Sequence, residues 1–169
     1  MKNEMISINP LELNENAINL IGKEWMLISA GTPDKLNTMT ASWGGLGMLW
    51  NRPVVFIFIR PQRYTYEFVE QNDYFTCCFF DKKYNDALHY CGSHSGRDVN
   101  KIEETGLRPV KSPSGSIFFE EARISLECRK IAFQDINPDG FLQESIAKNY
   151  PGHDYHRMYI GEITFCGIK

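Results

Sequence analysis

The stretch Asn37-Thr38-Met39-Thr40-Ala41-Ser42-Trp43 precedes an apolar run at residues 53–60, which leads directly into Pro61-Gln62-Arg63-Tyr64-Thr65. The first stretch is polar, built from small residues and compatible with a β-strand. The apolar run is continuous and bounded by prolines, which is typical of a strand buried on both faces. Two arginines and a threonine follow this strand, so the sequence predicts a site that surrounds a flat, aromatic anion.

Strand-like runs occur along the whole chain, and only brief helical segments separate them. The predicted strands cover residues 25–29, 37–42, 53–60, 74–80, 117–119, 122–128 and 154–168. The predicted short helices cover residues 65–72, 82–91, 100–105 and 141–148. This pattern favours a mainly β fold, with an antiparallel sheet closed into a barrel and a few short peripheral helices, over a parallel α/β sheet.

Three local patterns refine this prediction. Gly44, Gly45 and Gly47 favour a loop that wraps a ligand, because glycine permits close backbone approach. Thr65 is predicted to cap the helix at 65–72. The clearest period of two runs through residues 123–129, where Ile124, Leu126 and Cys128 alternate with Arg123, Ser125, Glu127 and Arg129.

Composition indicates one ordinary globular domain over residues 1–169. The chain is 43% hydrophobic and 13% aromatic, and its formal net charge is −3. No basic block favours nucleic acid, and no apolar run is long enough to cross a bilayer. The N-terminus lacks the apolar core of a secretory signal. Five cysteines without a C-x-x-C pair favour buried free thiols and a cytoplasmic location.

Arg60, Arg63 and Thr65 are candidate anion ligands. An arginine fork matches a phosphate, and a helix start offers a hydroxyl together with free backbone N–H groups. Spacing alone favours the plainer alternative, in which the arginines only solvate a strand end. A second loop of small residues, Ser95-Gly96-Arg97, leads to Lys101 and offers further donors and charge.

Histidines offer two further possibilities. His89, Cys91 and His94 match no structural zinc spacing, so no metal site is predicted. His153 and His156 precede the last strand, either as an exposed turn or as a histidine at the mouth of a pocket. The chain has no G-x-G-x-x-G, P-loop, H-E-x-x-H or G-x-S-x-G motif, and Ser93-His94-Ser95 stands in no hydrolase context.

Taken in order, these segments resemble the flavin reductase-like family of FMN-binding split barrels, in particular its flavoredoxin-like members. The resemblance covers residues 25–165. It is carried by residues 37–43, Trp50-Asn51-Arg52-Pro53, residues 60–65, residues 95–101, and His156 ahead of Ile160-Gly161-Glu162.

The resemblance implies a Greek-key split barrel and a set of FMN-binding residues. These residues are Asn37, Met39, Thr40, Ala41, Ser42, Trp43, Arg60, Arg63, Thr65, Ser95, Gly96, Arg97 and Lys101. Residues 39–43 would follow the isoalloxazine edge, and the cations and hydroxyls would lie toward the ribityl phosphate. His156 would be the catalytic residue, approaching the flavin or a nicotinamide. The family often has Gly-Asp-His here, whereas this chain has Gly152-His153-Asp154-Tyr155-His156, in which the spacing to Gly161-Glu162 selects His156.

The implied activity is hydride transfer from NADH or NADPH to flavin, followed by electron transfer to a small-molecule or protein acceptor. The cofactor carries this chemistry, which agrees with the lack of a nucleophile motif. The family also implies a homodimer with FMN near the subunit interface. Two alternatives stay open: a flavoredoxin-type electron-transfer protein that a partner protein reduces, and a non-catalytic flavin-binding module.

Overall fold

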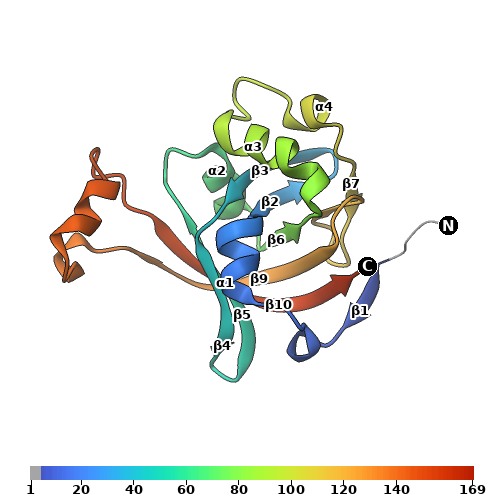
Figure 1. The fold of residues 1–169 in the computed structure, drawn as a ribbon, viewed down its shortest axis with the longest axis horizontal. Helices are drawn as coiled ribbons and strands as arrows, with labels where there is room; N and C mark the ends of the chain where they lie inside the picture. The colour runs from blue at the N-terminus through green and yellow to red at the C-terminus, as the bar shows by residue number, and fades with distance from the viewer. Residues whose placement is uncertain (1–4) are drawn as a thin grey trace.

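A computed structural model describes residues 5–169, and an eight-stranded antiparallel sheet forms its body (Figure 1). The strands of this sheet are β1 (Ile6–Ile8), β2 (Met26–Thr32), β3 (Lys35–Ala41), β4 (Gly44–Leu49), β5 (Arg52–Ile59), β6 (Tyr74–Phe79), β9 (Ile124–Asp135) and β10 (Arg157–Ile168). Their order is β3-β2-β6-β9-β10-β5-β4, and β1 pairs with β10. A separate hairpin joins β7 (Pro109–Lys111) to β8 (Ile117–Phe119). The prediction of a mainly antiparallel β fold is confirmed.

The helices are short and peripheral, as predicted. They are α1 (Ala17–Asn19) with its π-helical continuation Leu20–Glu24, α2 (Tyr64–Gln71), α3 (Asn85–Ser93) and α4 (Lys101–Thr105). Single 3₁₀ turns lie at Pro10–Glu12, Lys82–Tyr84, Pro138–Gly140 and Glu144–Asn149. Asn100 caps α4, and Gly106 ends it in the left-handed conformation with φ 68°. No helix in the described part of the chain is long and apolar enough to cross a membrane.

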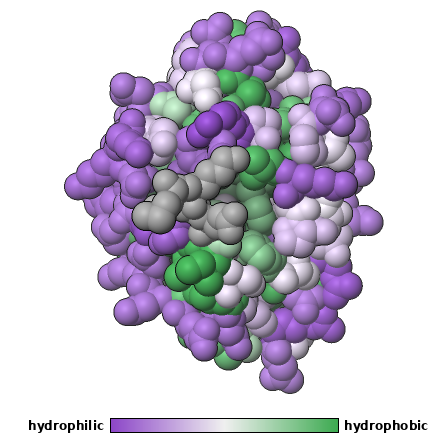
Figure 2. Space-filling model, turned by 90° about the vertical axis from the view of Figure 1, so that its right-hand side faces the viewer, coloured by the Kyte–Doolittle hydropathy of each residue, from purple (hydrophilic) through white to green (hydrophobic). Residues whose placement is uncertain are grey.

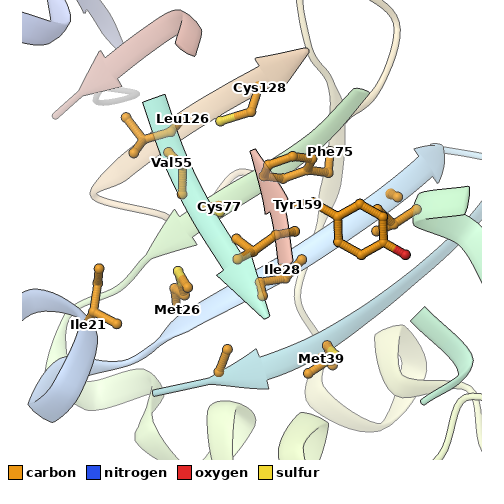
Figure 3. Close-up of a cluster of buried hydrophobic side chains, with 14 of the residues drawn as sticks. Ile21, Met26, Ile28, Met39, Val55, Phe75, Cys77, Leu126, Cys128 and Tyr159 are labelled. Atoms are coloured by element: carbon orange, nitrogen blue, oxygen red, sulfur yellow. The ribbon is translucent and has the colours of Figure 1, made fainter. Parts of the chain in front are cut away.

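Two apolar clusters pack on opposite faces of the sheet, as the two-residue period of a strand requires. The inner cluster includes Ile28, Phe75, Leu126 and Tyr159, which point into the curved sheet (Figure 3). The outer cluster lies beneath α3 and the β7–β8 hairpin and includes Leu27. Full burial of each large apolar side chain contributes roughly 1.5–3 kcal/mol, so these clusters stabilise the packing on both faces of the sheet.

The molecular surface on the side of the two termini is mainly hydrophilic. Figure 2 shows this side, where hydrophilic residues surround a smaller apolar area. All five cysteines are buried and unbonded, so the prediction of free thiols is confirmed.

Three local predictions were wrong. Residues 44–47 form strand β4 instead of a ligand-wrapping loop, because their backbone pairs with β5. Thr65 lies within α2, and Arg63 occupies the N-cap position without a side-chain cap bond. In β9, both sets of the predicted alternation are largely buried, since Ser125 and Glu127 are buried together with Ile124, Leu126 and Cys128.

The third error concerns the connection between β9 and β10. The segment predicted as a helix at residues 141–148 contains only the 3₁₀ turn Glu144–Asn149. This connection and the adjoining strand ends project from the body of the sheet (Figure 1). Aromatic contacts among Phe141, Tyr150 and Tyr155 fold the projection back on itself.

Candidate functional site

A cavity of about 170 Å³ opens where three strand ends meet, and we call it the strand-end cavity. It is lined by Met39, Thr40, Ala41, Ser42, Trp43, Phe58, Arg60, Arg63 and His156. The sheet register creates this meeting point. Arg157 of β10 pairs with Ile59 of β5, so His156 and Arg60 lie side by side just beyond the ladder.

A second cavity of about 160 Å³ lies where the start of α2 meets the end of α3, and we call it the helix-junction cavity. It is lined by Asn37, Gln62, Arg63, Tyr64, Thr65, Gly92, Ser93, His94, Ser95, Gly96 and Lys101. Arg63 lines both cavities, so the two form one continuous candidate site. The structure therefore brings together all of the predicted site residues except Arg97.

Arg63 is the group at the centre of this site. Its Nη1 donates to the Gly92 carbonyl at 3.2 Å, but its Nη2 is buried and has no hydrogen-bond partner within the described chain. Burial, followed by the nearby Arg60 charge, lowers the pKa of the guanidinium. A buried hydrogen-bond donor without a partner destabilises a fold by about 1–3 kcal/mol, so an acceptor that bound to Arg63 Nη2 would remove this cost.

Lys101 adds a second buried cation with only neutral partners. Its side chain is 5% exposed, and Nζ donates to the carbonyls of Thr38 at 2.7 Å and Cys91 at 2.8 Å. Burial lowers its pKa to about 8. Cys91 and Gly92 belong to the last turn of α3, whose negative dipole end attracts both cations. Helix capping therefore accounts for part of their placement, but it leaves the Nη2 donor of Arg63 free.

Asn37, Thr65 and Gly96 shape the wall between α2 and the loop after α3. The Asn37 amide donates to the Thr65 hydroxyl at 2.8 Å. A Cβ atom at Gly96 would lie 2.0 Å from Asn37 Oδ1, so only glycine allows this loop to approach β3. Ser95 Oγ accepts from the Arg97 backbone N–H at 3.2 Å. The wall is thus rigid and rich in polar groups.

The other two arginines are already paired with carboxylates. Arg60 contacts Asp154 Oδ2 at 2.9 Å and the Asn149 carbonyl at 2.6 Å. Arg97 lies outside both cavities, where it bonds Gln62 O at 3.0 Å, pairs with Glu67 and covers the Tyr64 ring. Of the predicted cations, therefore, Arg63 and Lys101 are the two without an ion-pair partner in the described chain.

His156 lies at the wall of the strand-end cavity and is 7% exposed. Its Nδ1 lies 2.8 Å from the Tyr150 hydroxyl, and its ring centroid lies 5.3 Å from that of Trp43. Burial, followed by the Arg60 charge, lowers its pKa to about 4, so the imidazole is neutral near pH 7. His153, by contrast, is exposed, and its side chain lies 3.0 Å from the Tyr155 hydroxyl, away from the cavity. The structure thus places His156, and not His153, at the cavity.

The sequence did not reveal several residues that line the site. These are Phe58, Gln62, Tyr64, Gly92, Ser93 and His94, together with Tyr150 behind His156. Gln62 and Tyr64 stand between the predicted residues 60 and 65, so their spacing offered a signal. The α3 residues gave none, because only tertiary packing brings the end of α3 to the start of α2.

No metal centre is formed by the histidines that the sequence singled out. His89 packs edge-on against Trp25 at 4.8 Å, and His94 stacks on Tyr90 at 4.0 Å. Across residues 5–169, no three His, Cys, Asp or Glu side chains gather as a ligand set.

The largest cleft of the molecule lies elsewhere and has a different electrostatic character. It measures about 720 Å³, and its walls carry arginines that are paired with acids, such as Arg108 with Glu120 and Glu121. The charges of its arginines are already compensated within the protein. The smaller cavities around Arg63, where charge is not compensated, are therefore the better candidate site.

Comparisons with known proteins agree with this fold. The family model of the flavin reductase like domain matches residues 19–169, and the chain therefore belongs to this family. None of the curated proteins compared with the chain matches it.

Several solved structures share the fold. An FMN-binding domain of a flavin reductase-like enzyme from Shewanella baltica is 20% identical, with 99% of this chain and 78% of that chain covered and a TM-score of 0.73. A flavoredoxin from Methanosarcina acetivorans is 22% identical, with 98% and 76% covered and a TM-score of 0.68. An NADH:FAD oxidoreductase from Streptomyces globisporus is 15% identical, with 86% and 74% covered and a TM-score of 0.66. The predicted split-barrel fold is confirmed.

Proposed function

We propose that this chain binds FMN and acts as an oxidoreductase that takes hydride from NADH or NADPH. The observation that carries the proposal is the unpartnered, buried Nη2 of Arg63 between two adjoining cavities. A phosphate in the helix-junction cavity would accept from this donor, while a flat ring occupies the strand-end cavity. Family membership and the FMN-binding neighbours support the same choice of ligand.

The residues present fit a phosphate ester. Lys101 supplies a nearby positive charge, and the uncapped first turn of α2 supplies backbone N–H groups beside Thr65. Ser95 and Gly96 line the same cavity, and the backbone N–H of Arg97, outside it, donates to Ser95 Oγ. These donors and cations replace the water that the phosphate leaves behind.

The strand-end cavity fits the flavin ring. Residues 39–43 line this cavity, and their backbone groups would read the polar rim of the ring; the Trp43 and His156 rings, with centroids 5.3 Å apart, also line it. When bound, FMN would supply the two-electron redox chemistry between the nicotinamide and an acceptor. The protein's own contribution is to orient the ring, exclude water and offer hydrogen-bond donors.

We also propose a homodimer. Trp43, Met48 and Trp50 are half exposed or more. Trp43 lines the strand-end cavity next to the start of β4, whereas Met48 and Trp50 lie near the turn at the other end of the β4–β5 hairpin. Exposed large apolar side chains commonly mark an interface, and a second copy packed along this hairpin would shield them together with the ring site.

A second candidate function is electron transfer without direct reduction by a nicotinamide. The flavoredoxins among the similar folds favour it. A non-catalytic flavin-binding module is the third candidate.

Two experiments separate these candidates. The visible spectrum of purified protein, with mass spectrometry of the molecule released on denaturation, tests flavin binding. A protein that stays colourless after addition of FMN would refute the proposal. Stopped-flow mixing of the FMN-loaded protein with NADH or NADPH tests the activity. Slow bleaching with both nucleotides would favour the flavoredoxin-type function.

A further inference from the structure

Tyr150 and His156 form a buried pair behind the strand-end cavity. Both side chains are 7% exposed, and the Tyr150 hydroxyl lies 2.8 Å from His156 Nδ1. Tyr150 itself does not line the cavity, whereas His156 does. The tyrosine therefore acts on the site only through the histidine.

The surroundings of Tyr150 hold its hydroxyl in place. Its ring stacks on Phe141 at 6.0 Å and contacts Tyr155 at 5.0 Å. The Arg60 guanidinium covers the ring at 5.2 Å and also binds the carbonyl of the preceding residue, Asn149. Because aromatic and cation–π contacts enclose the ring, the hydroxyl has little freedom to turn away from the imidazole.

The groups around His156 bear on where its imidazole carries a proton. The groups that face the imidazole are the Arg60 cation, its partner Asp154, the Tyr150 hydroxyl and, across the cavity, Arg63. Burial and the Arg60 charge disfavour an imidazolium, against the opposing effect of the Asp154 charge. A phenol that keeps its proton at neutral pH can donate it to Nδ1, and the imidazole proton then resides on Nε2; in the other tautomer, Nδ1–H would donate to the phenol oxygen.

We propose that Tyr150 is a positioning residue that locks His156 in the Nε2–H tautomer, so that the ring presents one N–H donor to the strand-end cavity. The inference rests on the proposed function, because the acceptor would be a carbonyl or ring nitrogen of the bound flavin or nicotinamide. His156 donates a hydrogen bond and keeps its proton. The donor stabilises negative charge as it develops on that acceptor.

The first test is nitrogen-15 NMR of the imidazole in flavin-free protein, with His156→Gln used to assign the signal. The wild-type protein is expected to show one protonated and one unprotonated nitrogen, with the proton on Nε2. In Tyr150→Phe the second tautomer becomes populated, and the two shifts move toward each other. A proton on Nδ1 in the wild type, or unchanged shifts in the variant, would overturn the proposal. The wild-type measurement holds even if the variant fails to fold.

A matched control exists on the same projection. Tyr155 lies 3.0 Å from Nδ1 of exposed His153, outside both cavities, so Tyr155→Phe removes an equivalent contact. This variant should leave the His156 signals unchanged. Movement of those signals in Tyr155→Phe as large as in Tyr150→Phe would point to general loosening of the projection and would contradict a specific role.

The second test uses FMN-loaded protein reduced by NADH or NADPH. Tyr150→Phe should lower the reduction rate about two- to tenfold, the range for loss of one neutral hydrogen bond, with FMN affinity unchanged. Equal rates for Tyr150→Phe and Tyr155→Phe would overturn the positioning role while leaving the proposed function intact. Failure of the wild-type protein to bind FMN would refute the proposed function, whereas the tautomer measurement would still stand.

Discussion

Replacing Arg63 by alanine tests the physical basis of the site. The Nη2 donor of Arg63 lacks a partner within the described chain, so a bound phosphate would form a new charge-assisted bond with it. Such bonds contribute about 1.5–3 kcal/mol, which corresponds to roughly 10- to 150-fold in affinity. We expect Arg63→Ala to weaken FMN binding by this factor. Riboflavin, which has no phosphate, should lose less than about threefold.

The same substitution has a distinctive effect on the ligand-free protein. It removes the 3.2 Å bond to the Gly92 carbonyl, but it also relieves burial of a charge beside Arg60. These effects oppose each other, so the free energy of unfolding should change by less than about 1 kcal/mol. An arginine kept for the fold alone would show a larger loss.

The assay is fluorescence titration of each flavin into wild-type protein, Arg63→Ala and Arg108→Ala. Arg108 pairs with Glu120 and Glu121 in the separate large cleft, so its loss should leave both affinities unchanged. Denaturant unfolding of the same three proteins supplies the stability comparison. Equal losses of FMN and riboflavin affinity in Arg63→Ala would refute the phosphate role.

Three further predictions follow from burial and charge. The pKa of Lys101 is about 8, below its ordinary 10.5, and a bound phosphate would raise it. FMN affinity should therefore fall as pH rises above 8, whereas riboflavin affinity should stay constant. Calorimetry in two buffers should detect proton uptake on FMN binding. The same pH dependence for both flavins would contradict a role of Lys101 at the phosphate. The folded pKa of His156 is about 4 against an ordinary 6.5. The unfolded chain thus binds more protons between these values, and stability should fall as pH drops from 6.5 to 4, by roughly 3 kcal/mol at most. In His156→Gln, the free energy of unfolding measured with denaturant should depend less on pH over this range. An unchanged pH dependence would contradict the lowered pKa of His156. In Gly161→Ala the new Cβ would lie 2.4 Å from the Phe75 ring, which should cost at least about 1–3 kcal/mol, whereas Gly140→Ala meets nothing within 4 Å and should be near neutral in thermal unfolding.

The strands were predictable where their own side chains carry the burial signal. Ile124, Leu126 and Cys128 repeat every two residues, and β9 begins at the first of them. Glycines 44, 45 and 47 gave the wrong prediction because β4 is specified by its backbone pairing with β5.

The segments that form the candidate site were predictable from the sequence, but the contacts between their side chains were not. The segments with Arg60, Arg63 and Thr65 stand close together in sequence, and β5 delivers them to one place. Spacing could not show that Arg60 is bound by Asp154, because that contact depends on the fold of the β9–β10 connection. Spacing also could not show that Tyr150 belongs beside His156, because the fold of the β9–β10 connection brings the two side chains together.

The distribution of charge explains why four cations in one region are not redundant. Arg60 and Arg97 bind Asp154 and Glu67, two carboxylates that would otherwise repel a phosphate. The positive charges of these two arginines are thereby neutralised by carboxylates within the protein. Arg63 and Lys101 instead contact only carbonyl groups, so their charge remains available.

This division predicts opposite consequences for the two kinds of cation. Arg97→Ala removes a partly exposed pair and frees the Glu67 carboxylate, so any loss of FMN affinity should be restored by the double variant Arg97→Ala/Glu67→Gln. The loss of FMN affinity in Arg63→Ala cannot be restored by removing a carboxylate, because Arg63 is not paired with one in the described chain. Comparison of FMN affinity across these three variants tests the division, and failure of the double variant to recover affinity would mean that Arg97 contacts the phosphate itself.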